Sequence, residues 1–253
     1  MNYFENREER KERAIKHTEE MKTMFPKRIT GSIKNSKIYG EKALTPNRSE
    51  TKGTPEMVFV NEDTVSAILT YADGKTAVLN FASFKNPGGM FIEGSSAQEE
   101  SLCHESYLYN VLKEIKGYYE WNNEHKNKAL YVNRAIYTPN IVFARKDAKM
   151  VDVLTCAAPN YKAAARYQHV TKEENDQVMK DRIEFVRDIC ETENVEIFIT
   201  GAFGCGVFGQ NPNTVATLFY NAFKDSSVKK VIFAVPGNDK NAQAFRQMFK
   251  EGA

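Results

Sequence analysis

The sequence predicts an α/β fold in which helices cover both faces of a mostly parallel sheet. From residue 56 onward, short apolar runs alternate with segments in which apolar residues recur at helical spacing. Alternation of strands with helices is typical of this fold class. The apolar runs are almost continuous, as is typical of strands that are buried on both faces. A chain of 253 residues is long enough to bury such a core.

The first 55 residues are more polar than the rest of the chain. In residues 5–24, apolar side chains recur at helical spacing, which predicts an amphipathic helix with a narrow apolar stripe. Residues 29–55 are rich in Lys, Ser, Thr and Gly and are expected to form short strands and loops. We therefore expect an accessory segment, residues 1–55, packed on a core domain, residues 56–253.

The core is expected to alternate strands and helices, with boundaries at turn residues. A helix over residues 97–116 is predicted because Leu108, Val111, Leu112 and Ile115 share one face. The other expected helices are residues 62–71, 172–192, 214–223 and 240–250. The expected strands are residues 57–61, 76–82, an extended pair within 131–144, 150–158, 195–200 and 228–235.

Composition argues against several kinds of partner and site. With 35 Lys and Arg against 33 Asp and Glu, the net charge of +2 does not favour a nucleic-acid or membrane partner. The four cysteines include no CxxC pair and the four histidines lack metal-ligand spacing, so we expect neither a metal site nor a disulfide framework. The sequence has no run long and apolar enough for a membrane helix. We expect a cytoplasmic protein that needs no cofactor.

Two glycine-rich loops follow predicted strands and are candidates for a binding site. The first is NPGGMFIEGSSA, residues 86–97, and the second is GAFGCGVFGQNPN, residues 201–213. In sheets of this class, ligands bind at the carboxyl ends of the strands. Glycine-rich turns and helix N-termini present backbone N–H groups there and let a phosphate approach closely. Two such loops in one sheet suggest a diphosphate ligand.

Local structure alone offers another interpretation of both loops. The sequence SAQE at residues 96–99 fits a capping box, with Ser96 as N-cap and Glu99 reaching back to it. That interpretation leaves the Pro-Gly-Gly sequence and the second glutamate unexplained. Residues 204–209 form a GxGxxG pattern, but too few residues follow it for a Rossmann dehydrogenase. Phe208, taken alone, is expected to be a packing aromatic.

Both loops resemble those of the bacterial-type poly(ADP-ribose) glycohydrolases, a branch of the macrodomain fold. The resemblance lies in VLNFASFKNPGGMFIEGSSAQEESLCHESYLY, residues 78–109, and in ITGAFGCGVFGQNP, residues 199–212. The family has a Gly-Gly-Gly loop followed, after a short spacer, by Gln-Glu-Glu. Here Gly88, Gly89 and Met90 are followed by seven residues and then by Gln-Glu-Glu. The segments ALYVNRAIYTPNIVFAR and VDVLTCAAPNY are also similar to the family.

The resemblance implies a macrodomain-like, three-layer α/β/α fold with a mixed, mostly parallel sheet and an N-terminal helical extension. It also implies that the ligand is ADP-ribose, carried on poly(ADP-ribose) or on ADP-ribosylated macromolecules. The implied reaction is hydrolysis of the ribose–ribose bond, which releases ADP-ribose from chain ends. Neither a membrane nor a direct nucleic-acid partner is expected.

By this resemblance, Glu100 is the catalytic acid, while Glu99 and Gln98 hold ribose hydroxyls. Asn80 and Asn86 lie in the strand-end segment that binds the distal ribose. The remaining implied ligand-binding residues are Gly88 and Gly89 beside the diphosphate, Met90 at the third loop position, Gly204, Cys205, Gly206 and Val207 with backbone N–H groups for the phosphates, and Phe208 against the distal ribose.

The chemistry of two adjacent carboxylates supports this division of roles independently. Neighbouring helical residues point about 100° apart, so Glu99 and Glu100 cannot play the same role. A glycosidic bond breaks through an oxocarbenium-like transition state, which a carboxylic acid assists by protonating the leaving oxygen. Burial and the like charge of Glu99 would favour the protonated form of Glu100, whereas the helix N-terminus would favour its anion.

The chain departs from the family at Met90, where the family has a third glycine. If this position requires a positive φ, methionine is strained there. Two alternatives to polymer hydrolysis therefore stay open. One is a macrodomain that binds ADP-ribose without turnover, as a reader or a sponge. The other is a mono-ADP-ribosyl hydrolase with weak activity on polymer.

Overall fold

The computed structural model describes residues 6–40, 53–143 and 148–252. Within these residues, eight strands form one sheet in the order β1-β4-β5-β3-β6-β7-β2-β8. Strand β4 is antiparallel to β1 and β5, whereas the other neighbouring strands are parallel. The strands are β1 (Lys37–Tyr39), β2 (Glu56–Val60), β3 (Thr76–Phe81), β4 (Ala135–Phe143), β5 (Lys149–Cys156), β6 (Ile197–Thr200), β7 (Lys230–Ala234) and β8 (Lys250–Glu251).

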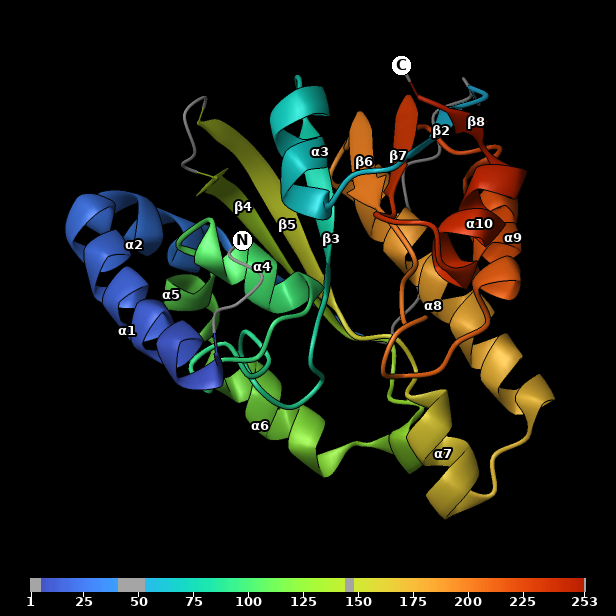
Figure 1. The fold of residues 1–253 in the computed structure, drawn as a ribbon, viewed down its shortest axis with the longest axis horizontal. Helices are drawn as coiled ribbons and strands as arrows, with labels where there is room; N and C mark the ends of the chain where they lie inside the picture. Colours follow the sequence, from blue (N-terminus) through green and yellow to red (C-terminus); the bar gives the residue numbers. More distant parts are fainter. Residues whose placement is uncertain (1–5, 41–52, 144–147, 253) are drawn as a thin grey trace.

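Helices cover both faces of this sheet (Figure 1). One layer contains α8, α9 and α10, and the other contains α1 to α6. No helix in the described ranges combines the length and apolar character needed to cross a membrane. The helices are α1 (Arg7–Met24), α2 (Pro26–Asn35), α3 (Thr64–Tyr71), α4 (Gln98–His104), α5 (Leu108–Leu112), α6 (Lys116–Glu124), the 3₁₀ helix η1 (Asn127–Ala129), α7 (Tyr161–Gln168), α8 (Lys172–Thr192), α9 (Pro212–Phe223) and α10 (Lys240–Met248).

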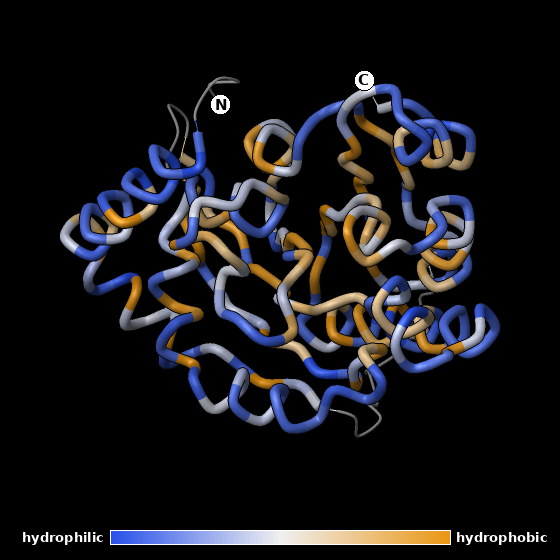
Figure 2. Tube along the Cα trace, turned by 60° about the horizontal axis from the view of Figure 1, so that its bottom comes forward, coloured by the Kyte–Doolittle hydropathy of each residue, from blue (hydrophilic) through white to orange (hydrophobic). Residues whose placement is uncertain are grey.

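Alternate strand residues face the two helical layers. In β2, Val58 and Val60 pack with the layer of α1 to α6, whereas Phe59 packs with the layer of α8 to α10. Both faces of a strand are then buried, which explains why the strands are almost continuously apolar. Figure 2 shows the hydrophobic segments gathered in the interior and the hydrophilic ones on the outer helices. The predicted three-layer α/β/α fold is confirmed.

The N-terminal segment contributes to the core of the protein. The side chains of Ala14, Met21 and Ile29 are buried in the same apolar cluster as the strand residues, and β1 adds an edge strand next to β4. The prediction of short strands and loops from residue 29 is wrong up to Asn35, because Pro26 starts helix α2 and Ile29 is buried on its inner face. Residues 41–52 of that prediction lie outside the described residues. The division at residue 55 stays a prediction.

The single helix predicted over residues 97–116 is divided into α4 and α5, and α6 begins at its end. The break lies at Ser106, whose hydroxyl donates to the carbonyl of Leu102 and accepts from the N–H of Leu108. Ser106 also forms an isolated antiparallel bridge with Phe143. A serine that bonds to neighbouring backbone groups competes with the helix, and here a contact from β4 reinforces the break.

Two further differences lie beyond α5. Instead of an extended pair within residues 131–144, the chain forms β4, with a register shift between Thr138 and Ile141 where Pro139 cannot donate to the ladder. Helix α7 was not predicted because its sequence, YKAAARYQ, has a single buried side chain, Ala164. The side chain of Asn160 caps it by accepting from the N–H of Ala163 at 3.1 Å. The remaining predicted strands and helices are present with small shifts at their ends.

Candidate active site

The first glycine loop follows β3 and approaches the carboxylates of α4. Gly88 and Gly89 have φ values of +66° and +63°, in the left-handed region that favours glycine. A Cβ at Gly88 would lie 2.7 Å from the ring of Tyr109. A Cβ at Gly89 would lie 2.6 Å from Oε1 of Glu100. Both positions therefore need glycine for backbone conformation and for space.

Met90 occupies the third loop position without the predicted strain. Its φ is not positive, and the residue is 42% exposed at the wall of a cavity. Its N–H donates to Oε1 of Glu100 at 2.9 Å. Since a backbone group makes this contact, the position accepts a side chain, and the expectation of strain at Met90 is wrong.

Helix α4 begins one residue later than the predicted capping box requires. Its N-cap is Ala97 rather than Ser96. Oε2 of Glu100, at the third helical position, accepts from the N–H of Ala97 at 3.0 Å. The prediction that Ser96 and Glu99 form the cap is therefore wrong. Because the helix starts at this register, Glu100 faces the glycine loop and Glu99 faces the end of β3.

Glu99 is held by donors at the end of β3. Its Oε2 accepts from the N–H of Ser83 at 2.7 Å, and its Oε1 accepts from Nδ2 of Asn80 at 3.2 Å. Only 3% of Glu99 and 5% of Glu100 is exposed. Burial raises the pKa of Glu99 to about 8; the N–H groups of Ser83, Asn80 and Gly88 oppose this shift, and the charge of Glu100 adds to it. The two carboxylates therefore have distinct surroundings.

Gln98 fixes α4 to the last residues of β3. Its Oε1 accepts from the N–H of Phe81 at 2.8 Å, and its Nε2 donates to the carbonyl of Leu79 at 2.8 Å. Both atoms of the amide are thus bound to backbone in this structure. Gln98 sets the position of the helix that carries both glutamates. Its predicted contact with a ribose hydroxyl stays a prediction.

The second glycine loop follows β6 and leaves several backbone donors open. Gly204 has a φ of +76°, and a Cβ there would lie 2.7 Å from Cβ of Ala158. By contrast, a Cβ at Gly206 would meet no atom within 4 Å. Among the described residues, no acceptor binds the N–H groups of Gly206, Val207 and Phe208. Successive free N–H groups in a turn form a concave site for an anion.

The residues around this loop have mainly structural contacts. The side chain of Cys205 is buried, and burial raises its pKa to about 12. Asn211 caps α9 by accepting from the N–H groups of Asn213 and Thr214, and Pro212 occupies the first turn. Within the described residues, no group of three or more His, Cys, Asp or Glu side chains could hold a metal ion.

The two loops enclose one open cavity of about 650 Å³. Nine of the predicted site residues line it: Gly89, Met90, Gln98, Glu99, Glu100, Gly204, Gly206, Val207 and Phe208. The other four do not line it. Asn80 and Gly88 are buried behind the wall, Cys205 is buried below its loop, and Asn86 is exposed outside it.

The cavity also has walls that the sequence did not single out. Phe81 and Phe203 meet with ring centroids 5.4 Å apart, and Ala158 closes the side near Gly204. Ser83 contributes the N–H that holds Glu99. These residues lie at the end of strand β3 or within three residues after strands β3, β5 and β6. Their place near the strand ends was the signal that could have found them.

Helix α1 holds the first glycine loop from outside the cavity. Nε of Arg7 donates to the carbonyl of Glu93 and Nε of Arg10 donates to the carbonyl of Gly94, each at 2.8 Å. Gly94 has a φ of +74°, and a Cβ there would lie 2.2 Å from the carbonyl oxygen of Arg7. The loop that reaches Glu100 through Met90 is therefore tied to the N-terminal helix.

Comparison with solved structures places this fold among those of poly(ADP-ribose) glycohydrolases. The structure is similar to that of poly(ADP-ribose) glycohydrolase from Thermomonospora curvata, with a TM-score of 0.87 and 25% sequence identity over 96% of this chain and 100% of that one. A structure of that enzyme bound to the inhibitor ADP-HPD has a TM-score of 0.85, with the same identity and coverage. The enzyme from Deinococcus radiodurans in complex with ADP-ribose has a TM-score of 0.77 and 27% identity over 87% of this chain and 96% of that one.

The sequence comparison agrees with the structural one. No curated protein matches this sequence. Residues 8–146, more than half of the chain, match the family described as microbial-type PARG, catalytic domain. That range contains the first glycine loop and both glutamates of α4. This chain therefore belongs to the family of microbial-type PARG catalytic domains.

Proposed function

We propose that this protein hydrolyses the ribose–ribose O-glycosidic bonds of poly(ADP-ribose) and releases ADP-ribose, with Glu100 as general acid. The observation that carries the proposal is a pair of buried, adjacent carboxylates in the wall of a cavity between two glycine loops. The related structures bound to ADP-ribose and to ADP-HPD support the ligand class.

The diphosphate of ADP-ribose binds at the second glycine loop. The N–H groups of Gly206, Val207 and Phe208 supply donors without adding charge. The first loop brings Gly89 against the carboxylates, so the distal ribose lies between Phe208 and Glu100. Glu99 accepts from ribose hydroxyls in addition to the donors that already hold it.

In the reaction, the carboxylic acid of Glu100 donates its proton to the oxygen that leaves with the next unit of the polymer. The bond between this oxygen and the anomeric carbon of the distal ribose breaks through an oxocarbenium-like transition state. Water then adds to the anomeric carbon and returns a proton to Glu100. The N–H groups of Met90 and Ala97 hold the two oxygens of Glu100 and fix its orientation.

Incubation with labelled poly(ADP-ribose), and separately with mono-ADP-ribosylated protein, tests this function. Chromatography of the products should show free ADP-ribose released from polymer. Release from the mono-ADP-ribosylated protein alone would favour the mono-ADP-ribosyl hydrolase. Tight binding of ADP-ribose without its release from either substrate would favour a reader or a sponge. The strain at Met90, which was an argument for such a binder, is absent from the structure.

We also propose that the protein works in a reducing compartment such as the cytoplasm. All four cysteines are buried and free: Cys103, Cys156, Cys190 and Cys205. Burial raises the pKa of each of these thiols, which keeps them protonated and unreactive. Thiols without disulfides are typical of reducing compartments.

A further inference from the structure

A second cavity, of about 370 Å³, lies beside the catalytic cavity and carries positive charge. We call it the lysine pocket and define it by Lys85, Lys126, Lys128, Tyr131, Asn160 and Tyr167. None of the side chains that line it is acidic. In the described part of the chain, Lys85 and Lys126 form no ion pair, while Lys128 lies 3.7 Å from the exposed Glu174. Such a cavity favours an anionic ligand.

The lysine pocket shares an aromatic wall with the catalytic cavity. The ring of Tyr131 stacks on Phe84 with centroids 4.1 Å apart, and it meets the ring of Phe208 edge-on at 6.3 Å. Phe208 lines the catalytic cavity. Helix α7, which contributes Ala163, Tyr167 and Gln168 to the lysine pocket, lies at the lower end of the sheet in Figure 1, where β3 ends. A ligand that extends out of the catalytic cavity over this wall reaches the lysines.

The backbone between α6 and β4 is held in an unusual conformation at this pocket. Asn127, Lys128, Ala129 and Tyr131 all have positive φ, between 40° and 66°. Residues other than glycine are strained in this region, and such strain clusters at ligand sites. The carbonyl of Ala129 accepts from the N–H of Asn160 at 3.0 Å, which ties the strained segment to the start of α7. This conformation places Tyr131 between the two cavities.

We propose that the lysine pocket binds the ADP-ribose unit next to the one that is cleaved off, so that the enzyme holds two units of the polymer. Lys85 and Lys126 meet the diphosphate of this second unit, and its adenine stacks on the ring of Tyr167, a residue that is 65% exposed. The inference rests on the proposed function, because it assigns a subsite for the same polymer. Stacking of a base on an aromatic ring strengthens binding without reading the identity of the base.

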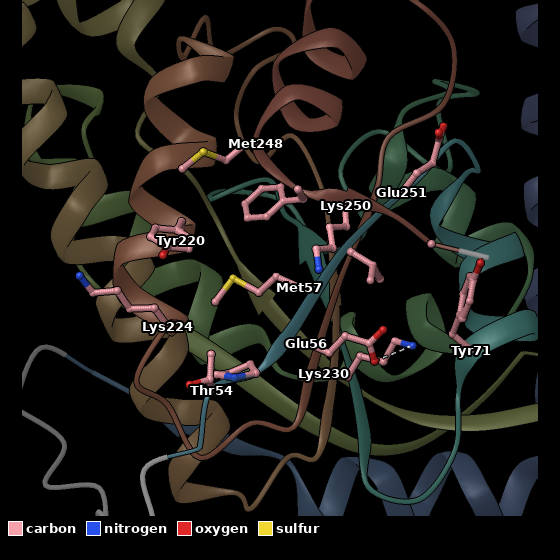
Figure 3. A pocket seen from close by; sticks show the side chains of 14 residues that line it. Thr54, Glu56, Met57, Tyr71, Tyr220, Lys224, Lys230, Met248, Lys250 and Glu251 are labelled. Atoms are coloured by element: carbon pink, nitrogen blue, oxygen red, sulfur yellow. Dashed lines mark ion pairs between the residues drawn. The ribbon is translucent and has the colours of Figure 1, made fainter.

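Another lysine-lined cavity provides a matched control. It has a volume of about 580 Å³ and lies at the starts of β2 and β7, the opposite end of these strands from the glycine loops. Figure 3 shows its three lysines together with Glu56 and Glu251. Lys230 pairs with Glu56 at 3.1 Å. These carboxylates reduce the positive charge, so Lys224 and Lys250 serve as control positions.

The test measures binding with Glu100→Gln in the full chain, so that turnover does not consume the ligand. Calorimetry compares ADP-ribose with a linear oligomer of defined length that has several ADP-ribose units. We expect the oligomer to bind about tenfold more tightly than ADP-ribose. Adding Lys85→Gln and Lys126→Gln should remove this difference and lower the salt dependence of oligomer binding by about one unit of slope for each lysine. Binding of ADP-ribose should change less than about twofold.

Adding Tyr167→Ala instead should also weaken binding of the oligomer but not of ADP-ribose. Adding Lys224→Gln and Lys250→Gln should leave the affinity for both ligands unchanged. Equal affinities of the starting protein for oligomer and ADP-ribose would overturn the proposal, and so would equal losses in the pocket and control variants. Failure of the proposed function is distinct, because it appears as no release of ADP-ribose from polymer by the unmodified protein.

Discussion

Gly89 and Met90 are neighbours in the first loop but meet different constraints. Gly89→Ala places a Cβ 2.6 Å from Oε1 of Glu100 at a φ of +63°. This variant should lose more than tenfold in kcat/KM on polymer, because the loop must move away from the carboxylate. Met90→Gly keeps the N–H that holds Glu100 and should retain affinity for ADP-ribose and turnover within about threefold.

Kinetics and calorimetry on both variants check this pair, with circular dichroism as the control for folding. The cost of Met90→Gly should appear in stability, at up to about 1 kcal/mol, since glycine loses more backbone entropy on folding. A large loss of turnover and affinity in Met90→Gly would show that the methionine side chain contacts the substrate.

The raised pKa of Glu99 links stability to pH. Folding favours the protonated form, because the pKa rises from 4.5 to about 8. The contribution of Glu99 to stability is therefore complete below about pH 4.5 and is lost as the pH rises toward about 8. The glutamine in Glu99→Gln cannot ionise, so the free energy of unfolding of this variant should fall less over this pH range than that of the unmodified protein. The difference between the two falls should be at most about 4 kcal/mol.

Urea denaturation at several pH values measures this difference without a ligand. The control variant is Asp63→Asn, which removes a carboxylate at the exposed N-cap of α3, away from the active site. Identical pH profiles for the unmodified protein and Glu99→Gln would mean that Glu99 is ionised in the folded protein over this range.

At the scale of elements, we expect the contact between α1 and the first glycine loop to support the active site. Removing the two guanidinium groups with Arg7→Gln and Arg10→Gln should loosen the loop around Met90 and lower kcat/KM about tenfold. Amide hydrogen exchange in residues 88–96 should become faster. Lys16→Gln, on an exposed position of the same helix, is the matched control. If amide exchange and turnover are both unchanged in the arginine variants, α1 does not support the active site.

The elements that the sequence predicted well are those whose pattern reflects burial. The strands of the core and the long helix α8 carry strong apolar signals, and a threonine caps α8 at the predicted start. The breaks were missed where tertiary contacts override local periodicity. Ser106 interrupts the predicted helix by bonding to the backbone and by forming an isolated bridge with Phe143 at the end of β4. The sequence around Ser106 does not indicate that Phe143 is its partner.

At the scale of the whole molecule, the sequence located the site better than it assigned the contacts within it. The glycine loops and the Gln-Glu-Glu motif meet at one cavity, as the strand-end rule and the resemblance predicted. The register at Ala97, which decides which glutamate faces the loop, required the structure. So did the engagement of Gln98 with backbone, because Phe81 and Leu79 reach it only in the folded sheet.

Binding of ADP-ribose should not require a divalent cation. The proposed anion site consists of backbone N–H groups on the second loop, which would complement a diphosphate without a metal ion. Calorimetry with a chelator present, and again with added Mg²⁺, should give the same affinity within about twofold. Loss of binding in chelator that Mg²⁺ restores would contradict this account of the anion site.

The most direct test of the central claim is single-turnover hydrolysis of poly(ADP-ribose) by Glu100→Gln, together with calorimetry of ADP-ribose. Glutamine keeps the size of the side chain and one acceptor oxygen but has no transferable proton. Turnover should fall by about 10²- to 10⁴-fold, the range of general acid catalysis, while affinity for ADP-ribose stays within about threefold. Glu99→Gln should lose less turnover than Glu100→Gln. Equal turnover in Glu100→Gln and the unmodified protein would remove Glu100 from the mechanism.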